Sequence, residues 1–354
     1  MWKGMVIHMK KFIAKVGIFV LLIGGTVVPV NVLIDPYNIF HADRIRDNGV
    51  EPNKNYFKTK YIIENPDKFD SYLFGSSRVG FMDVEKMKGG SYYDMMYSEG
   101  LPYEHLKTLK AFISHGVIPK NVLMGVDDIS YFVDPAWHEG QLYRLSFPYE
   151  GDFYDKLGFY IRYLDIITTL QSLKTIRKYG EPNLEKVERY YRTGTEDLTV
   201  ERPFDENANV PYWADYYSPR LDQVMNEIRE IRDLCQEYGI SLTVFTNPIH
   251  ATTYAKDVEH GYLDFLEALA DIVPYYNFSG FNNITLNNDY YYETSHFKPL
   301  AGDVMIQAMF GQGVSEELQS QGFGVYVTKE NKEEIMGILK EQVRIREIAC
   351  LYWK

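Results

Sequence analysis

Near its N-terminus the chain carries a long uncharged apolar run. Residues 16–34 read VGIFVLLIGGTVVPVNVLI, which is just long enough to cross the hydrocarbon core of a membrane as a helix. Lys10, Lys11 and Lys15 stand directly before the run, and the positive-inside rule keeps such lysines in the cytoplasm. The pattern therefore predicts a cytoplasmic tip and a transmembrane signal anchor over residues 1–34, with the main domain outside the cytoplasm.

A cleaved signal peptide is the alternative interpretation of the same run. Cleavage needs a short apolar core followed by two small residues that are separated by one residue, and residues 30–32 offer no convincing site of this kind. The segment that follows is rich in Asp, Asn and Pro. Such composition favours irregular chain, so we expect a linker over residues 35–69.

From residue 70 onward, short apolar runs alternate with segments of helical spacing. Strands are expected at 71–75, 91–97, 121–126, 241–248 and 274–280. Helices are expected directly after the first strand, at 104–116, 220–238 and 257–273, and from Pro299 onward. This alternation predicts an α/β fold with a mostly parallel sheet that is covered on both faces.

Two segments depart from this alternation. Residues 131–219 are dense in aromatic and charged side chains, and they predict a helical insertion or lid because so long a connection in a compact domain has structure or function of its own. Residues 315–354 predict a C-terminal helical tail with one helix over 333–349. The α/β domain is therefore expected over residues 70–314.

Composition narrows the class of protein. The chain has 354 residues, with 37 Lys+Arg against 49 Asp+Glu, which gives a net charge of −12. This balance excludes a generally basic nucleic-acid binder, so we expect no nucleic-acid partner. The hydrophobic fraction of 45% is ordinary for a globular protein and permits a buried core.

Candidate chemistry lies at the ends of the expected strands. Ligands of open parallel sheets collect at the carboxyl ends of the strands, so the residues just after each strand are the first candidates. In chain order these residues read GSSR (75–78), YSEG (97–100), GVDD (125–128) and TNPIH (246–250), and the last segment, after the fifth strand, is ETSH (293–296).

A serine, a histidine and a carboxylate among these residues suit nucleophilic catalysis. A serine hydroxyl needs a base within hydrogen-bond reach, and the base needs an acceptor that orients it. Ser77, His296 and Glu293 have the chemistry for these three roles. A helix beginning at Ser77 would also place backbone N–H groups near an oxyanion. The plainer interpretation is a Gly-Ser-Ser turn that only caps a helix.

The same residues resemble the motifs of the SGNH (GDSL-like) hydrolase and acyltransferase superfamily. Gly75-Ser76-Ser77 is similar to the Gly-x-Ser of the first motif, and Glu293-x-x-His296 has the spacing of the last motif, Asp-x-x-His, with Glu in place of Asp. The resemblance covers about residues 70–312, with the insertion unmatched. It is greatest to membrane-anchored members such as the D-alanyl transfer protein of teichoic acids and the alginate O-acetyltransferase group.

The resemblance implies an oxyanion hole as well. Gly100 corresponds to the glycine of the second motif, and Gly125-Val126-Asp127-Asp128 approaches the Gly-x-Asn-Asp of the third. The implied hole comprises Ser77, Gly100 and Asp127. Asp127 stands where the family has an Asn, and a carboxylate there would repel the oxyanion unless it were protonated.

From the resemblance we expect a three-layer α/β/α, flavodoxin-like domain that performs ester chemistry without a metal or a cofactor. The expected function is a membrane-anchored, extracytoplasmic serine esterase or O-acyltransferase, which takes an acyl group from a donor and acts on a cell-surface polysaccharide or related polymer. The alternative is a catalytically inactive protein of the same fold that binds or assembles such a polymer.

Three further residues are candidates for substrate binding. Arg78 suits an anionic substrate, although pairing with a surface acid is commoner. Asn247 and His250 follow the fourth strand, where His250 either lines the substrate site or makes a loop hydrogen bond. A metal phosphoesterase that binds a divalent metal through Asp127, Asp128, His250 and His296 remains a weaker alternative, because no close His-x-His or Asp-x-Asp spacing supports it.

Overall fold

The computed structural model describes residues 2–41, 44–164 and 166–352. Its chain forms two compact units. The N-terminal unit comprises Met1–Asn53 and Phe147–Val187, and the sheet unit comprises Lys54–Ser146 and Glu188–Lys354. The insertion expected over 131–219 is thus divided between the two units.

The sheet unit is built on six strands in the order β2-β1-β3-β4-β5-β6. Neighbouring strands are parallel except β5 and β6, which are antiparallel. The α/β class and the mostly parallel sheet are therefore confirmed. The strands are β1 (Ser71–Phe74), β2 (Tyr92–Asp94), β3 (Asn121–Val126), β4 (Ser241–Thr246), β5 (Tyr275–Asn277) and β6 (Val325–Val327).

Helices of the sheet unit follow the predicted alternation in part. They are α2 (Lys54–Glu64), α3 (Pro102–Ser114), α4 (Asp128–Phe132), α8 (Leu221–Tyr238), α9 (Ala251–Glu259), α10 (Tyr262–Ile272), α11 (Pro299–Phe310), α12 (Glu316–Ser320) and α13 (Lys332–Tyr352), while α7 (Leu184–Arg192) straddles the boundary with the N-terminal unit. Short 3-10 helices are η2 (Ser77–Phe81), η3 (Val84–Lys86), η4 (Pro135–Gly140), η5 (Leu142–Arg144), η6 (Trp213–Asp215) and η7 (Asn288–Tyr290).

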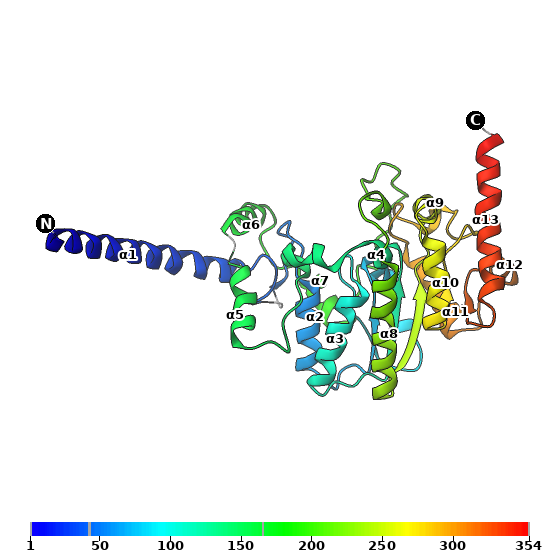
Figure 1. Ribbon diagram of the computed structural model, residues 1–354, viewed down its shortest axis with the longest axis horizontal. Coiled ribbons are helices and arrows are strands. Elements are labelled where there is room, and N and C mark those ends of the chain that lie inside the picture. Colours follow the sequence, from blue (N-terminus) through cyan, green and yellow to red (C-terminus); the bar gives the residue numbers. More distant parts are fainter. Residues whose placement is uncertain (1, 42–43, 165, 353–354) are drawn as a thin grey trace. The chain divides into compact units, whose positions relative to one another are not determined.

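Side chains of alternate strand residues enter two separate hydrophobic clusters. Tyr72 and Phe74 of β1 belong to one cluster, and Leu73 between them belongs to the other. The first cluster also receives side chains from α3, α8 and α10, and the second receives them from α11. Figure 1 shows α3, α8 and α10 along the sheet. Both faces of the sheet are therefore packed with apolar side chains.

Local signals explain where several helices end. Gly239 adopts φ +67° directly after α8, a left-handed conformation that glycine takes without steric cost, and the chain then enters β4. Gly261 adopts φ +89° between α9 and α10, so the single helix expected over 257–273 is two helices. The helix expected after β1 is replaced by the short 3-10 helices η2 and η3.

The expected domain limits were wrong at both ends. Helix α2 lies inside the expected linker 35–69, and its Lys58 ammonium is buried, where it donates to the carbonyls of Met96 (2.8 Å) and Gly194 (2.7 Å). Strand β6 lies inside the expected helical tail and pairs with β5. The sheet unit therefore begins before residue 70 and continues beyond residue 314.

The N-terminal unit contains α1 (Trp2–Ile34), α5 (Phe153–Arg162) and α6 (Ile166–Tyr179). Within α1, residues His8–Ile34 are long and apolar enough to cross a membrane, a property shared by anchors and signal sequences. The end of α1 packs against α6, where the Asn31 side-chain amide donates to Thr169 Oγ1 at 2.5 Å. Beyond α1, the Asp35 carboxylate accepts the N–H groups of residues 39–41.

Candidate functional site

Strand β1 ends at a turn that only glycine fits. A Cβ on Gly75 would lie 2.7 Å from Val79 Cγ1 and 3.4 Å from the carbonyl oxygen of Gly125. The chain therefore passes close to β3 and turns at once into η2, whose first residue is Ser77. Ser77 is half-buried, whereas the preceding Ser76 is 1% exposed.

The structure brings Ser77, His296 and Glu293 into one hydrogen-bonded chain, which we call the triad. Ser77 Oγ lies 2.8 Å from His296 Nε2, and His296 Nδ1 lies 2.5 Å from Glu293 Oε1. Because a carboxylate only accepts, Nδ1 carries the proton and Nε2 is left to accept from the serine hydroxyl. This is the arrangement in which a histidine acts as a general base toward serine.

Glu293 is held in its orienting position by its own loop. Its Oε1 also accepts the backbone N–H of His296 at 2.9 Å, so backbone and ring bind the same oxygen. Burial acts to raise the pKa of Glu293, but the hydrogen bonds and charge of His296 outweigh burial and hold that pKa below its ordinary value. The carboxylate is therefore ionised at neutral pH.

An arginine from the insertion lies beside the second oxygen of Glu293. The guanidinium of Arg202 is 3.7 Å from Glu293 Oε2 and lies over the ring of Tyr292, 4.9 Å from its centroid. Arg202 is more than half exposed, so its attraction to the carboxylate is screened by water. No local pattern predicts this contact, because Arg202 lies some ninety residues before Glu293.

Aromatic packing fixes the imidazole from the side. The ring of Phe81, at the end of η2, meets the His296 ring edge-on at 5.8 Å and the Tyr292 ring at 5.2 Å. Tyr292 in turn donates its hydroxyl to the carbonyl of Val200 at 2.6 Å. The segment that carries Ser77 and the loop that carries His296 are thus packed together through Phe81.

A second polar cluster lies immediately behind the turn and is buried. The Arg78 guanidinium binds the carboxylates of Asp127 (2.8 Å) and Asp128 and donates to the carbonyl of Ser295 at 2.8 Å. Arg78 is 1% exposed. Burial acts to lower its pKa, but the two aspartates raise the pKa above the ordinary value, so the guanidinium stays charged. We call Ser76, Arg78, Asp127, Asp128 and Asn247 the Arg78 cluster.

The structure corrects the substrate-binding role expected for Arg78 and Asn247. Both side chains are buried, and the Asn247 amide donates to Asp127 Oδ2 at 2.9 Å. A side chain enclosed by protein and already bonded to a carboxylate has no surface with which to contact a substrate. These two residues instead tie the end of β4 to the end of β3 and the turn after β1.

Asp127 likewise differs from its expected place in an oxyanion hole. Its carboxylate is 1% exposed and accepts from Ser76 Oγ (2.8 Å), Asn247 and Arg78, while it also caps α4 by accepting the Ser130 N–H at 3.3 Å. Every bond therefore points into the protein, and the expected repulsion of an oxyanion loses its geometric basis.

Among the described residues, no group of three or more His, Cys, Asp or Glu side chains could hold a metal ion.

Gly100 is close to the turn, but its N–H is already used. A Cβ on Gly100 would lie 2.5 Å from the Gly75 carbonyl oxygen and 2.8 Å from the His105 ring, which explains the glycine. Its N–H donates to the Tyr97 carbonyl at 3.2 Å, which corrects the expected oxyanion role. Within the described part of the chain, the Ser77 N–H donates to no protein acceptor.

The loop before Gly100 is held by contacts that no sequence pattern predicts. Glu99 adopts φ +55°, a strained conformation for a side chain of this size, and its carboxylate pairs with the buried guanidinium of Arg144. Arg144 also contacts His138 Nε2 at 3.0 Å, and His138 Nδ1 lies 2.7 Å from Glu104. These partners come from distant positions, so a local motif does not reveal them.

His250 makes the loop hydrogen bonds that were one of its two expected roles. Its Nδ1 accepts the N–H of Thr252 at 3.2 Å and caps α9, and its Nε2 lies 3.0 Å from Asn288 Oδ1. The ring stacks against Phe204 at 5.2 Å. Burial lowers the pKa of His250, so the ring is neutral at neutral pH. A structural role accounts for both ring nitrogens.

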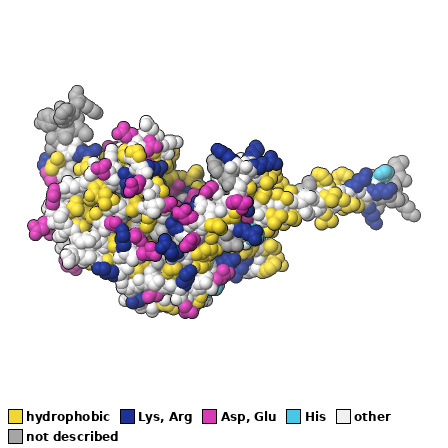
Figure 2. Space-filling view, turned by 180° about the vertical axis from the view of Figure 1, so that it is seen from behind, with side chains coloured by type: hydrophobic (Ala, Val, Ile, Leu, Met, Phe, Trp, Pro, Cys, Tyr) yellow, Lys and Arg dark blue, Asp and Glu magenta, His cyan; other side chains and the backbone are white. Residues whose placement is uncertain are grey.

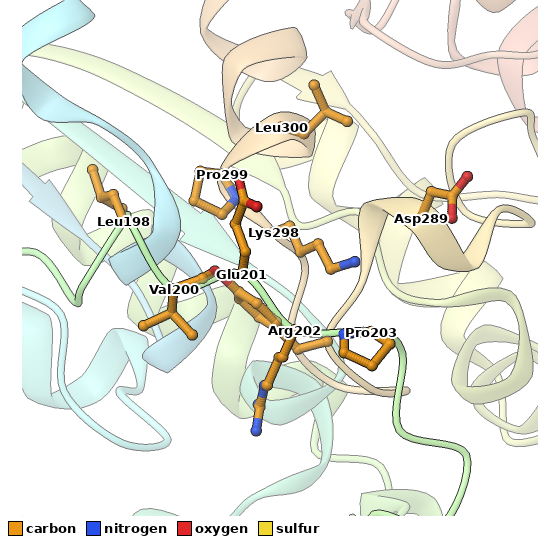
Figure 3. Close-up of a pocket in the computed structure, with 10 residues that line it drawn as sticks. Leu198, Val200, Glu201, Arg202, Pro203, Asp289, Lys298, Pro299 and Leu300 are labelled. Carbon is orange, nitrogen blue, oxygen red and sulfur yellow. The ribbon is translucent and has the colours of Figure 1, made fainter.

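A pocket of about 590 Å³ (Figure 3) is lined in part by Arg202, whose guanidinium lies 3.7 Å from Glu293 of the triad. It is bordered by the segment around Arg202 and by the start of α11, and Tyr292 forms part of its wall. Its lining residues are Leu198, Val200, Glu201, Arg202, Pro203, Asp289, Tyr292, Lys298, Pro299 and Leu300. Apolar and charged side chains of both signs therefore surround a space large enough for a segment of substrate.

Comparison of the sequence with protein-family models and with curated proteins finds no match. The resemblance to the SGNH hydrolases therefore stays a prediction from the sequence motifs.

Proposed function

We propose that this protein is an SGNH-like serine esterase or O-acyltransferase, anchored in a membrane by α1. The observation that carries the proposal is the continuous hydrogen-bonded chain from Ser77 through His296 to Glu293. Supporting it, strands β1 to β5 follow the order 2-1-3-4-5 of flavodoxin-like sheets, in which ligands bind at the carboxyl ends of strands. Ser77 stands at such an end.

The proposed reaction has two steps. His296 Nε2 takes the proton of Ser77 as the Ser77 oxygen bonds to the ester carbonyl carbon, and the imidazolium then returns that proton to the leaving alkoxide. In the second step, Nε2 takes the proton of water or a sugar hydroxyl as its oxygen bonds to the acyl carbon. The imidazolium then gives that proton to Ser77 Oγ as the bond between Oγ and the acyl carbon breaks. The Glu293 carboxylate stabilises the imidazolium in both steps, which its depressed pKa favours.

The surroundings of the triad favour a polymer as the acyl acceptor or substrate. The pocket beside Tyr292 has an open, mixed lining of the kind that binds an extended chain in part. Three lysines before the apolar part of α1 orient the sheet unit outward by the positive-inside rule. The proposed substrate class is therefore a cell-surface polysaccharide or related polymer.

A retained anchor is favoured over a cleaved signal sequence by the packing of α1. Asn31 near the end of α1 is 1% exposed and bonded to Thr169 of α6. Cleavage after this point would remove Asn31, the buried hydrogen-bond partner of Thr169, from the folded N-terminal unit. The end of α1 is thus part of a folded structure as well as part of an apolar run.

A non-catalytic role in binding surface polymers is the second candidate. The observation that favours it is the oxyanion environment, because the Gly100 N–H is engaged and the Asp127 carboxylate is turned inward. These two groups add no donor for an oxyanion, and oxyanion donors are a large part of acyl-transfer catalysis.

A fluorophosphonate probe distinguishes the two candidates, because it reacts covalently with activated serines. The full chain in detergent is treated with the probe and digested, and the modified residue is located by mass spectrometry. We expect labelling of wild type at Ser77, no labelling of Ser77→Ala, and retained labelling of Ser76→Ala, the matched control one residue away. A folded wild type that takes no label contradicts the enzyme and supports the binding role.

A further inference from the structure

Helices α5 and α6 of the N-terminal unit expose apolar side chains to solvent. On α5, Phe153 and Tyr154 are 71% and 77% exposed, and Leu157 and Ile161 are exposed as well. On α6, Leu170 is more than half exposed. Figure 2 shows hydrophobic side chains along α1 and on the surface next to its end, with Lys and Arg side chains beside them. Large apolar side chains that gather on a water-exposed surface indicate that a membrane or another protein covers this surface.

Helix α5 is apolar on two opposite sides. Phe153, Leu157 and Ile161 are spaced by four residues and share one side of the helix. Phe159 and Tyr163 lie on the opposite side and are buried, with their rings 5.0 Å apart. Packing within the unit therefore accounts for the second side and leaves the first side without an apolar environment.

The position of α6 relative to α1 identifies what covers this surface. Residues 16–34 span about 28 Å at about 1.5 Å per residue, close to the thickness of a bilayer's hydrocarbon core. Asn31, which bonds Thr169, lies three residues before Ile34, or about 4.5 Å inside the end of this span. Helix α6 thus meets α1 at the depth where lipid headgroups join the acyl chains.

We propose that α5 and α6 lie in the outer interface of the membrane that α1 spans, with their exposed apolar side chains among the lipid acyl chains. The charges of α6 agree with this placement. Lys174 and Arg177 are exposed and follow Leu170 at four and seven residues, so they share its side of the helix. Basic side chains next to an apolar surface are the pattern of helices that lie on anionic lipids.

This placement rests on the membrane anchor of the proposed function and adds a consequence to it. The exposed sides of α5 and α6 form a second, lateral attachment next to the first one. The N-terminal unit is then attached to the membrane through α5 and α6 as well as through α1.

The test uses full-length protein reconstituted into vesicles of phosphatidylcholine and phosphatidylglycerol. Cys235 and Cys350 are replaced by alanine, and an NBD fluorophore is attached to a single cysteine in the variants Leu157→Cys and Leu170→Cys. Leu21→Cys within α1 is the membrane control, and Ile118→Cys, an exposed position of the sheet unit, is the aqueous control. Quenching is measured with iodide on both sides of the membrane and with lipids spin-labelled near the headgroup.

We expect labels at Leu157→Cys and Leu170→Cys to be quenched strongly by the spin-labelled lipid and several-fold less by iodide than the label at Ile118→Cys. Equal iodide quenching at all three sites would overturn the proposal. Protection from iodide without quenching by the lipid would also overturn it, because a second copy or another protein then covers the surface. If the label at Leu21→Cys also escapes the lipid quencher, the anchor itself fails, which distinguishes that failure from the failure of this inference.

Discussion

Two polar clusters meet at the Ser76-Ser77 peptide and differ in their exposure. The triad is half-open, with the His296 side chain 31% exposed and Ser77 accessible to solvent. The Arg78 cluster on the other side is almost wholly buried, and its charges are paired with one another. Both clusters are built from residues at strand ends, so position in the sheet alone does not decide which residues meet a substrate.

The hydrogen-bond partners of Ser76 and Ser77 distinguish the two neighbouring serines. Ser76 directs its hydroxyl at the buried Asp127 carboxylate, and Ser77 directs its hydroxyl at a histidine that reaches solvent. A hydroxyl that donates to a buried carboxylate is a fixed donor, whereas one that donates to an imidazole nitrogen can give up its proton to that nitrogen. The partner of each serine therefore separates a structural residue from a candidate nucleophile.

The largest effect is expected from Ser77→Ala. Removing the nucleophile should lower turnover of an activated ester by a factor of about 10⁴ to 10⁶, with the free energy of unfolding nearly unchanged because Ser77 is half-buried. Turnover is measured with p-nitrophenyl acetate and folding is checked by circular dichroism. Unchanged turnover would remove Ser77 from the mechanism.

Glu293→Gln is expected to have the next largest effect. Glutamine keeps the shape of the side chain but loses the charge that stabilises the imidazolium, so turnover should fall by about 10² to 10⁴. The variant is compared with wild type in the same ester assay at neutral pH. A loss smaller than tenfold would indicate that the Glu293–His296 bond serves structure alone.

Arg78→Met tests the structural role of the buried Arg78 cluster. The substitution leaves Asp127 and Asp128 buried without their counter-charge, so the free energy of unfolding should fall by about 3–5 kcal/mol. Urea unfolding measures the change. Lys86→Met is the matched control, since Lys86 pairs with Asp303 at the surface, and its loss should cost less than about 1 kcal/mol. Equal costs would contradict the assignment.

Ser76→Ala should lower turnover less than Ser77→Ala does, and should lower stability less than Arg78→Met does. It removes one hydrogen bond to Asp127, which keeps its bonds to Arg78 and Asn247, so we expect a loss of about 1 kcal/mol in stability. Ester turnover should stay within a few-fold of wild type. A loss of turnover comparable to that of Ser77→Ala would reverse the roles given to the two serines.

The smallest effect concerns pH. The pKa of Glu293 in the folded protein lies below its ordinary value of 4.5, so ionised Glu293 contributes stability that is complete above about pH 4.5 and is lost as the pH falls through the folded pKa. The stability difference between wild type and Glu293→Gln should therefore shrink on acidification. Urea unfolding at several pH values tests this, and a difference that grows toward low pH would contradict the depressed pKa.

The strands and the triad could be predicted because local patterns encode them. An apolar run that ends at Gly75, followed by two serines, indicates both the end of β1 and the position of the Ser77 hydroxyl. The spacing of Glu293 and His296 is short enough for one loop to hold both in contact. These features depend on neighbouring residues, which a sequence displays directly.

The features that were missed depend on distant partners. Helix α2 reads as polar because of its lysines, yet Lys58 is buried with carbonyl acceptors from two remote segments. Strand β6 has three residues and is defined by its pairing with β5. Arg78 reads as a surface cation, and its burial follows from two aspartates about fifty residues away. A local pattern contains none of these contacts.

Acyl-enzyme formation at Ser77 can be tested by a rapid-mixing assay of the full chain with p-nitrophenyl acetate, quenched for intact-protein and peptide mass spectrometry. We expect a burst of p-nitrophenol that matches the enzyme concentration and an acetyl group on Ser77, both present in Ser76→Ala and both absent in Ser77→Ala. A folded wild type that gives neither a burst nor an acetylated Ser77 would contradict acyl-enzyme chemistry at this site.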